Sequence, residues 1–390
     1  MKVVCAPDSL KGSLSAVEAA AAMGRGVRAA FAKLGMEVEV VEIPIADGGE
    51  GTVEAFIAAM GGHMRRVRVT GPLPGSEVEA AYGVFEEPDA EAAVGRPVRV
   101  GVVELSAAAG LALVSASQRD PGRTTTFGVG QLLGRALGES GNRVILGLGG
   151  SATNDGGCGM VQAIGGVFRD RSGLVMDGVV TGERLIDVGD IDLSGLDARL
   201  AGRLEVACDV TNPLTGPTGA AAVYGPQKGA TAERVMELDA GLANLGRVWR
   251  ERLGVDVGAM PGAGAAGGCG GGVVAMLGGR LRHGIGLVLD AVGFVDRVRG
   301  ADLVLTAEGC LDGQSASGKA VMGVAGAARE AGVETVALVG SVGDGVEGLL
   351  AEGLAGYCVI GEGLSEAESV RRAGELTEAA AERVCRERLG

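Results

Sequence analysis

A chain of 390 residues exceeds the usual size of one hydrophobic core, so we expect two domains. Apolar residues make up 47% and charged residues 22%, which is the balance of a globular protein and excludes a disordered chain. The formal net charge of −14 disfavours nucleic acid and anionic membranes as the main partners.

The seven cysteines include no Cys-x-x-Cys pair, which is typical of free thiols in a reducing compartment. No signal-peptide pattern begins the chain, and the apolar run at 262–279 is too rich in Gly and Ala to span a membrane. We therefore expect a cytoplasmic protein without a membrane partner. The 72 glycines are scattered, which favours many short loops of the kind that α/β folds place at ligand sites.

The two ends of the chain alternate between strands and helices. The helix expected at 14–34 has Ser13 or Ser15 as its cap and Gly35 as its stop. Polar residues cluster after the strands, at the edge where open parallel sheets bind ligands. The expected strands are 2–6, 38–45, 302–306, 335–340 and 356–360, and the helices are 14–34, 53–60, 318–331, 346–352 and 366–388.

The middle of the chain has a different rhythm. Alternating apolar and polar residues over 63–104 predict a mixed or antiparallel sheet, with a hairpin tip at 86–97. We place a boundary near Pro72 and expect an α/β protein of two domains. A doubly wound parallel sheet would be built from 1–72 and 285–390, with an inserted α/β domain of mixed sheet at 73–284 and a ligand in the cleft between them. The other elements expected here are strands 63–70, 78–84, 98–104, 143–146 and 204–209, helices 126–137, 157–165 and 232–253, and a glycine-alanine loop at 261–272.

Residues 147–159, Gly-Leu-Gly-Gly-Ser-Ala-Thr-Asn-Asp-Gly-Gly-Cys-Gly, are the strongest candidate for a binding site. An apolar strand precedes them and a helix follows, so glycine amides and the positive end of the helix would face an anion. Ser151, Thr153, Asn154 and Asp155 exceed the single cap that a structural turn needs. We predict that this loop binds phosphate or a polar substrate.

Two loops near the N-terminus leave alternatives open. In residues 8–13, Asp-Ser-Leu-Lys-Gly-Ser, Lys11 is either an anion contact or a solvated lysine at a helix entrance. Asp47 and Glu50 are separated by glycines. They would hold magnesium or substrate hydroxyls, or else form an ordinary turn before a helix.

Two later segments add acids and lysines. Asp209 ends an expected strand, which is a recurrent metal or catalytic position, and Lys228 between Gln227 and Gly229 resembles an anion contact. Residues 306–319 carry Glu308 and Asp312 and end in Ser-Gly-Lys at a helix start. This is not a Walker A loop, because Ala320 stands where that motif requires Ser or Thr.

The sequence lacks several common catalytic sets. There is no Gly-x-Ser-x-Gly elbow, and the two histidines, His63 and His283, have no partner motif. No Gly-x-Gly-x-x-Gly follows the first strand, which disfavours a nicotinamide cofactor. Aspartates, lysines and glycine loops without histidine favour phosphoryl transfer, in which catalysis is mostly positioning and charge neutralisation.

Together these segments resemble the bacterial glycerate kinases of the type that phosphorylates the 2-hydroxyl. The resemblance covers nearly the whole chain and implies ATP, Mg²⁺, D-glycerate as acceptor and 2-phosphoglycerate as product. It also implies a flavodoxin-like domain beside a second α/β domain. The segments that carry it are 6–11, 46–52, 124–128, 149–157, 207–214, 225–230, 262–268 and 308–319.

The chain departs from the family pattern at a few positions. Cys310 stands where arginine is usual, Ala307 where glycine is usual and Ser315 where threonine is usual. Ala109 replaces a serine in the segment at 104–111. At Cys310 the planar donor set of an arginine is absent, and a nearby lysine does not replace it. These positions therefore bear on acceptor identity and turnover.

From the loops and the resemblance we predict a site with distinct roles in the cleft between the domains. Asp312 would orient or deprotonate the attacking hydroxyl, while Lys11 holds substrate and Lys319 neutralises the γ-phosphoryl group. Asp209 or Glu308 would bind Mg²⁺. The predicted substrate-binding residues are Asp8, Asp47, Ser151, Asn154, Asp155 and Gln314, and the predicted ATP-binding residues are Gly149, Gly150, Gly156, Gly157, Lys228, Gly262 and Gly264.

Alternative functions stay open at this point. The chain could phosphorylate another small hydroxy acid or the 3-hydroxyl of glycerate, or it could be a non-catalytic sensor of a sugar acid or a nucleotide. We expect small-molecule partners and leave a homodimer open.

Overall fold

The structure is a computed structural model that describes residues 1–10, 12–46, 48–87, 97–141, 143–200, 202–316 and 320–390. By its internal contacts the chain divides into two compact units. The first unit comprises Met1–Asp47, Glu54–Gly61 and His283–Gly390, and the second comprises Gly48–Val53 and Gly62–Arg282. Within the described ranges, no helix combines the length and the apolar character needed to cross a bilayer.

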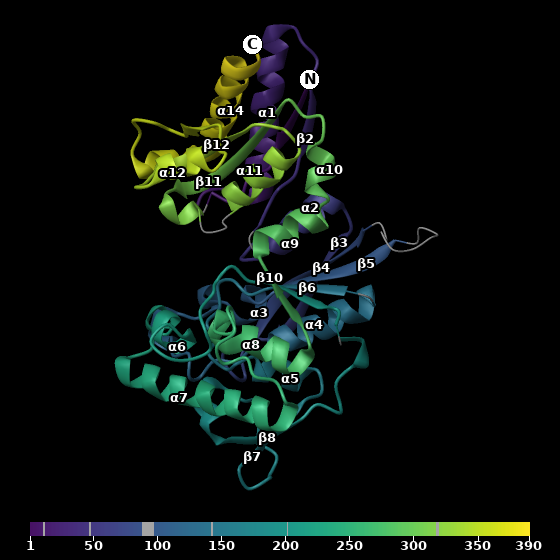
Figure 1. The fold of residues 1–390 in the computed structure, drawn as a ribbon, viewed down its shortest axis with the longest axis vertical. Helices are drawn as coiled ribbons and strands as arrows, with labels where there is room; N and C mark the ends of the chain where they lie inside the picture. Colours follow the sequence, from purple (N-terminus) through teal and green to yellow (C-terminus); the bar gives the residue numbers. More distant parts are fainter. Residues whose placement is uncertain (11, 47, 88–96, 142, 201, 317–319) are drawn as a thin grey trace. The chain divides into compact units, whose positions relative to one another are not determined.

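A parallel five-stranded sheet forms the centre of the first unit, in the order β13-β12-β11-β1-β2. Counted along the unit this is the order 2-1-3-4-5 of flavodoxin-like folds. The expectation that both ends of the chain build one sheet is confirmed, and Figure 1 shows both termini in this unit. Its strands are β1 (Lys2–Cys5), β2 (Glu39–Glu42), β11 (Leu303–Leu311), β12 (Thr335–Val342) and β13 (Gly356–Val359).

Helices supply apolar residues to two clusters of this unit. In α1 (Ala16–Leu34), Ser15 and Glu18 form a capping box at the start and Gly35 is the left-handed residue at the end. α1 packs with α14 (Ala373–Leu389) in one cluster, and α11 (Ala320–Glu330) with α12 (Val346–Ala351) in the other. The remaining helices are α2 (Thr52–Met60), α9 (Gly284–Ala291), α10 (Phe294–Val298) and α13 (Glu366–Arg371).

The second unit is built on a mixed six-stranded sheet in the order β10-β9-β6-β5-β4-β3. The strands β10, β9, β6 and β5 are parallel, while β4 and β3 join antiparallel at one edge. A separate hairpin consists of β7 and β8. The strands are β3 (His63–Thr70), β4 (Glu77–Glu87), β5 (Val98–Glu104), β6 (Arg143–Gly147), β7 (Val167–Asp170), β8 (Val188–Asp192), β9 (Leu204–Ala207) and β10 (Arg280–Arg282).

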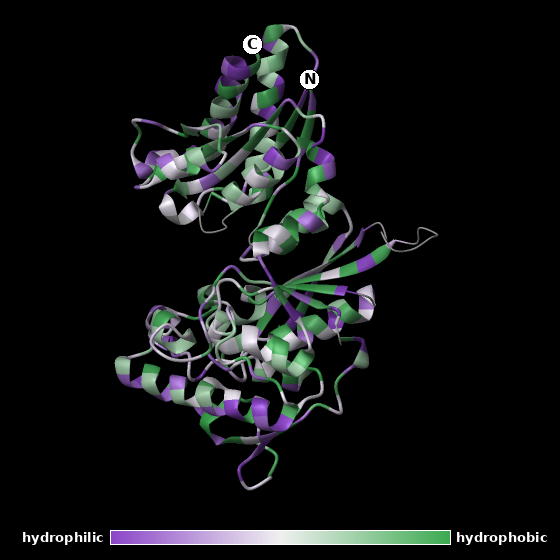
Figure 2. Cartoon of the chain, in the orientation of Figure 1, coloured by the Kyte–Doolittle hydropathy of each residue, from purple (hydrophilic) through white to green (hydrophobic). Residues whose placement is uncertain are grey.

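Six helices of the described part cover this sheet and the hairpin. Figure 2 shows alternating apolar and polar residues along α7, as expected for an amphipathic helix, and Leu238, Leu242 and Leu245 are buried in the core of the unit. The helices are α3 (Ser106–Ala109), α4 (Phe127–Ser140), α5 (Cys158–Ala163), α6 (Ala220–Tyr224), α7 (Ala232–Val248) and α8 (Ala265–Leu277).

Three expectations are corrected by the structure. We placed β3 with residues 1–72, but it pairs with β4 from Thr70 to His63 and therefore belongs to the second sheet. The loop expected at 261–272 is shorter than predicted, because α8 begins at Ala265 and, after non-helical residues at 266–268, continues through 269–272. The single helix expected at 366–388 is divided at Arg372 into α13 and α14.

Candidate active site

Polar residues gather where β1 and β11 end. These neighbouring strands are the point at which the strand order reverses, and open α/β sheets bind ligands there. The backbone N–H of Asp8 donates to the carbonyl oxygen of Ala307 at 3.1 Å, so the two strand ends lie side by side. Of the residues predicted for this edge, Lys11, Asp47 and Lys319 and the side chain of Gln314 lie outside the described part.

Glu308, Asp312 and Ser315 come together at the end of β11. The Ser315 hydroxyl donates to Glu308 Oε2 at 3.0 Å, and the backbone N–H of Asp312 donates to Ser315 Oγ at 3.3 Å. We expected Glu308 in a loop, but β11 runs to Leu311 and holds it on a strand. Cys310 is exposed two residues further along, on the same face of the strand as Glu308.

In the second unit, the glycine loop at 148–157 follows β6 at the carboxyl edge of the parallel strands. The N–H of Gly149 donates to the carbonyl oxygen of Gly48 at 3.2 Å, and a Cβ at Gly149 would lie 2.6 Å from Gly49 Cα. The N–H of Ala152 donates to the carbonyl oxygen of Ala109 at 2.8 Å. The loop is therefore packed against the segments that follow β5 and precede α2.

The other predicted glycine loop meets the first one. The N–H of Gly156 donates to the carbonyl oxygen of Gly267 at 3.0 Å, and the N–H of Gly264 donates to the carbonyl oxygen of Asn212 at 3.0 Å. A Cβ at Gly262 would lie 3.1 Å from Cys208 Sγ. The glycine turns, which are far apart in sequence, therefore adjoin one another and the segment around Asp209.

Asp155 fastens this loop to two helices. Its Oδ2 accepts hydrogen bonds from the N–H of Thr126 at 2.7 Å and from the Thr126 hydroxyl at 2.8 Å, and its Oδ1 accepts the N–H of Gly157 at 3.1 Å. The side chain is fully buried, and burial raises its pKa, while these donors act in the opposite direction. Substrate binding by Asp155 stays a prediction, and these hydrogen bonds give its carboxylate a role in anchoring the loop.

Lys228 is also buried, at 3% exposure. Its Nζ donates to Ser151 Oγ at 2.8 Å and to the carbonyl oxygen of Thr153 at 2.7 Å. Burial lowers the Lys228 pKa to about 8, because the charged ammonium group loses its hydration. ATP binding by Lys228 stays a prediction, and its two hydrogen bonds also hold the loop that carries Ser151.

Unsatisfied polar atoms occur beside this lysine. Asn154 is 1% exposed, and neither its Oδ1 nor its Nδ2 finds a hydrogen-bond partner among the described residues. The same holds for the Thr153 hydroxyl. Buried polar atoms without partners cost free energy, so their presence next to the glycine loops favours a binding function for this region.

Glu104 was not among the residues predicted for the site. It ends β5 and is 8% exposed, and its Oε1 accepts the N–H of Val53 at 2.7 Å at the start of α2. Burial raises the Glu104 pKa. The signal that could have found it is the one used for Asp209, an acid at the end of a buried strand.

The predicted metal ligands lie in different units, Asp209 after β9 in the second and Glu308 on β11 in the first. Within the described ranges, no three His, Cys, Asp or Glu side chains form a group suited to a metal ion. Magnesium usually takes one or two carboxylates together with substrate phosphates and water, so the oxygen donors around Glu308 fit its chemistry without such a group.

The sequence profile of the glycerate kinase family matches residues 3–388. The chain belongs to this family. It is 42% identical over 385 residues to a protein named glycerate kinase from Halalkalibacterium halodurans, covering 98% of this chain and 97% of the relative. It is 44% identical over 347 residues to a protein named glycerate 2-kinase from Escherichia coli K12, covering 89% and 87%.

A solved structure supports the same membership. The crystal structure of a protein described as glycerate kinase 2 from Salmonella typhimurium LT2 matches with a TM-score of 0.84 and 42% identity, covering 98% of this chain and 97% of that one. The resemblance argued from the sequence segments is thus confirmed, and so are the predictions of a two-unit α/β fold and of a kinase.

Proposed function

We propose that this protein transfers the γ-phosphoryl group of ATP to the 2-hydroxyl of D-glycerate, giving 2-phosphoglycerate and ADP. The observation that carries the proposal is the similarity over 89% of the chain to a protein named glycerate 2-kinase. The absence of a histidine-based nucleophile set from the sequence supports a reaction that depends on positioning and charge neutralisation.

The phosphates of ATP are proposed to lie on the adjoining glycine turns of the second unit. Gly150, Gly156 and Gly157 have φ values of 71°, 60° and 76°, which turn the backbone in ways that a side chain would oppose. Most N–H groups of these turns donate within the protein, so the phosphates are proposed to rest on the close backbone approach that glycine allows. Gly149, Gly262 and Gly264 complete the backbone surface of the adjoining turns.

Substrate binding is proposed for Ser151 and Asn154. The Ser151 hydroxyl accepts a hydrogen bond from Lys228, which leaves its own hydrogen available for a carboxylate or hydroxyl oxygen. The unpaired amide of Asn154 offers both a donor and an acceptor. Lys11, Asp8, Asp47 and Gln314 remain predicted substrate contacts from the sequence.

Magnesium is proposed to be held by Glu308 or Asp209 together with the phosphates. When bound, the ion would neutralise phosphate charge and orient the γ-phosphoryl group. The backbone N–H of Asp312 donates to Ser315 Oγ, which fixes the position of this residue. Its carboxylate is proposed to accept the proton of the attacking hydroxyl. Lys319 is proposed to stabilise negative charge that develops on the transferred group.

An assay of ADP release tests this function. Purified protein with ATP and Mg²⁺ is offered D-glycerate, L-glycerate, glycolate, lactate and tartrate in separate reactions. We expect the highest kcat/KM for D-glycerate. A preference for another hydroxy acid would redirect the proposal to that acceptor, and no ADP release with any of them would favour a non-catalytic sensor.

Two further expectations belong to this proposal. We infer that the two units are separately folded domains, as their distinct sheets and cores suggest. A cytoplasmic location and a homodimer remain predictions.

A further inference from the structure

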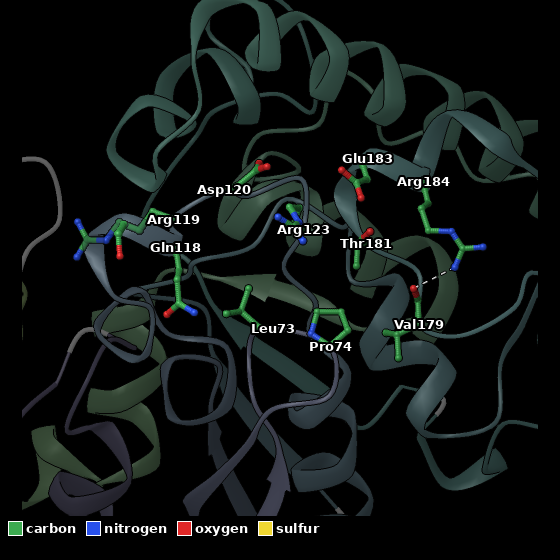
Figure 3. Close-up of a pocket in the computed structure, with 11 residues that line it drawn as sticks. Leu73, Pro74, Gln118, Arg119, Asp120, Arg123, Val179, Thr181, Glu183 and Arg184 are labelled. Carbon is green, nitrogen blue, oxygen red and sulfur yellow. Dashed lines mark hydrogen bonds between the residues drawn. The ribbon is translucent and has the colours of Figure 1, made fainter.

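A cavity of about 630 Å³ lies in the second unit among residues that the proposed phosphoryl transfer does not use (Figure 3). Three segments line it, around Leu73, around Arg123 and around Thr181. The volume falls in the usual range for sites of small-molecule ligands. No residue that we have placed in substrate, ATP or magnesium binding contributes to its wall.

Both acidic side chains of this wall pair with Arg234. Arg234 Nη2 lies 2.8 Å from Asp120 Oδ2 and 2.5 Å from Glu183 Oε2. Hydrogen bonding by Arg234 lowers the Asp120 pKa, so this carboxylate stays charged and paired. Arg119, Arg123 and Arg184 also line the cavity, so arginines outnumber the carboxylates of its wall.

Arg123 is the guanidinium that remains available. Figure 3 shows it between Asp120, Thr181 and Pro74, while Arg184 is held by the carbonyl oxygen of Val179 at 3.2 Å. Arg123 is exposed, and while its backbone N–H donates to the carbonyl oxygen of Asp120 at 3.0 Å, its guanidinium makes no hydrogen bond or ion pair with any residue that the structure describes.

Two further donors of the wall have no partner in the described ranges. Thr181 is 5% exposed and its hydroxyl makes no hydrogen bond there, and the buried Arg119 Nε is unsatisfied. A planar guanidinium beside a free hydroxyl is a donor set suited to carboxylate or phosphate oxygens. The protein as a whole carries a net charge of −14, so a local excess of arginine is not a consequence of composition.

Residues next to the cavity wall contact the loop of the candidate active site. The Thr124 hydroxyl donates to the carbonyl oxygen of Pro121 at 3.2 Å and to that of Ala152 at 2.9 Å. A Cβ at Gly182 would lie 2.8 Å from the Pro121 oxygen and 3.0 Å from the carbonyl oxygen of Asn154. Gly182, which lies between the lining residues Thr181 and Glu183, is thus packed against the backbone of Asn154.

We propose that this cavity is a second binding site, for a small metabolite that carries carboxylate or phosphate groups. Arg123 forms the main contact, and the Thr181 hydroxyl adds a hydrogen bond. A ligand seated there rests on the backbone that supports the glycine loop at 148–157. The site goes beyond the proposed phosphoryl transfer and does not depend on it.

Isothermal titration calorimetry of the full chain tests the proposal with pyrophosphate and with citrate as probes. We expect one of them to bind, and Arg123→Gln to weaken that binding by at least about tenfold, since a hydrogen-bonded charge contact is lost. Thr181→Val should weaken it less. Arg250→Gln removes an exposed arginine outside the cavity and serves as the matched control.

The calorimetry measures binding and not turnover, so its outcome does not depend on whether the proposed kinase activity is correct. Equal affinity and stoichiometry in wild type and Arg123→Gln would overturn the proposal, because a probe bound at the glycine loops would survive the substitution. Binding of neither probe at millimolar concentration would overturn it, as would equal weakening by Arg250→Gln. Thermal unfolding of Arg123→Gln at the wild-type midpoint confirms that the variant is folded.

Discussion

Gly267 shows how a single residue shapes the candidate site. It has a φ of 68°, and a Cβ there would lie 2.1 Å from the carbonyl oxygen of Thr153 and 2.5 Å from Asn154 Cα. Both the conformation and the close approach exclude a side chain. The contact brings the loop at 262–268 against the loop at 148–157, so the packing of the two turns depends on this position.

Gly267→Ala is expected to destabilise the protein by about 3 kcal/mol, as the sum of left-handed strain and overpacking. Gly278→Ala is the matched control, because Gly278 ends the same helix with a φ of 62° and a Cβ there would meet no atom within 4 Å. That control should lose only about 1 kcal/mol. Urea denaturation compares the two, and equal losses would contradict the close contact.

Lys228 illustrates how burial acts on a charge. Its pKa falls from the ordinary 10.5 to about 8 in the folded protein, so the unfolded chain binds more protons between these values. Stability from this group therefore rises as the pH increases through that window. Below about pH 8 the folded protein carries the cost of a buried ammonium group, which the hydrogen bonds to Ser151 and Thr153 offset.

Lys228→Met should remove this pH dependence. Between pH 7.5 and pH 9.5 we expect the thermal midpoint of the wild type to rise relative to that of the variant. The reason is that Lys228 becomes neutral over this range, so the wild type no longer carries the free-energy cost of a buried ammonium group. Differential scanning fluorimetry over that range measures it, with Lys33→Met as a control for the loss of an exposed lysine. A difference that stays constant with pH would show that Lys228 is not buried as described.

Asp312 is the residue proposed to act as the general base. If it accepts the proton of the attacking hydroxyl, Asp312→Asn should lower kcat by about two orders of magnitude or more, with ATP binding retained. Asp344→Asn is the control, because Asp344 accepts the N–H of Gly313 at 2.8 Å through its backbone carbonyl, which the substitution keeps. Wild-type turnover of Asp312→Asn in the ADP-release assay would remove Asp312 from this role.

At the scale of elements, Asp155 joins α4 and α5. It accepts N–H groups at the start of each helix, from Thr126 before α4 and from Gly157 and Gly159 at α5. A carboxylate at these positions also complements the positive helix ends. The loop between β6 and α5 is therefore anchored to a helix that precedes it in the chain.

Asp155→Asn is expected to loosen both helices, because an amide nitrogen would face at least one of these N–H donors. The loss should be about 2 kcal/mol. Hydrogen exchange followed by mass spectrometry should show faster exchange in 127–140 and 158–163, whereas Asp170→Asn in an exposed turn should not. Unchanged protection of both helices would contradict the anchoring role.

Sequence patterns predicted elements best where local chemistry decides them. Ser15, Glu18 and Gly35 mark the ends of α1, and alternation marks the strands on either side of the hairpin at 86–97. The tip of that hairpin lies outside the described residues. The helix α8 was interpreted as a loop, because a run of Gly and Ala has a low helix propensity that buried packing overrides.

Part of the candidate site follows from sequence patterns, and part depends on contacts between distant segments. The glycine turns and Glu308 with Asp312 follow from motif and strand position, and each group is brought together in its own unit. The burial of Asp155 and Lys228 could not be predicted, because it depends on Thr126 and on Ser151 with Thr153, contacts that no local pattern encodes.

At the scale of the whole molecule, the chain forms two main sheets that differ in strand direction and in the parts of the sequence that supply their strands. The parallel sheet takes β1 and β2 from the start of the chain and β11 to β13 from the end, so a long insertion separates neighbours in one sheet. Each sheet presents polar residues at the carboxyl edge of its parallel strands. Glycine turns follow the parallel strands of the second sheet, whereas Glu308 and Asp312 lie at the end of β11 in the first.

Phosphorus NMR of the product formed from D-glycerate, ATP and Mg²⁺ tests this account most directly. The account predicts resonances of ADP and of 2-phosphoglycerate, with the phosphorus coupled to the single proton on carbon 2. A product phosphorylated on carbon 3, with coupling to two protons, or a spectrum in which ATP remains unchanged, would contradict it.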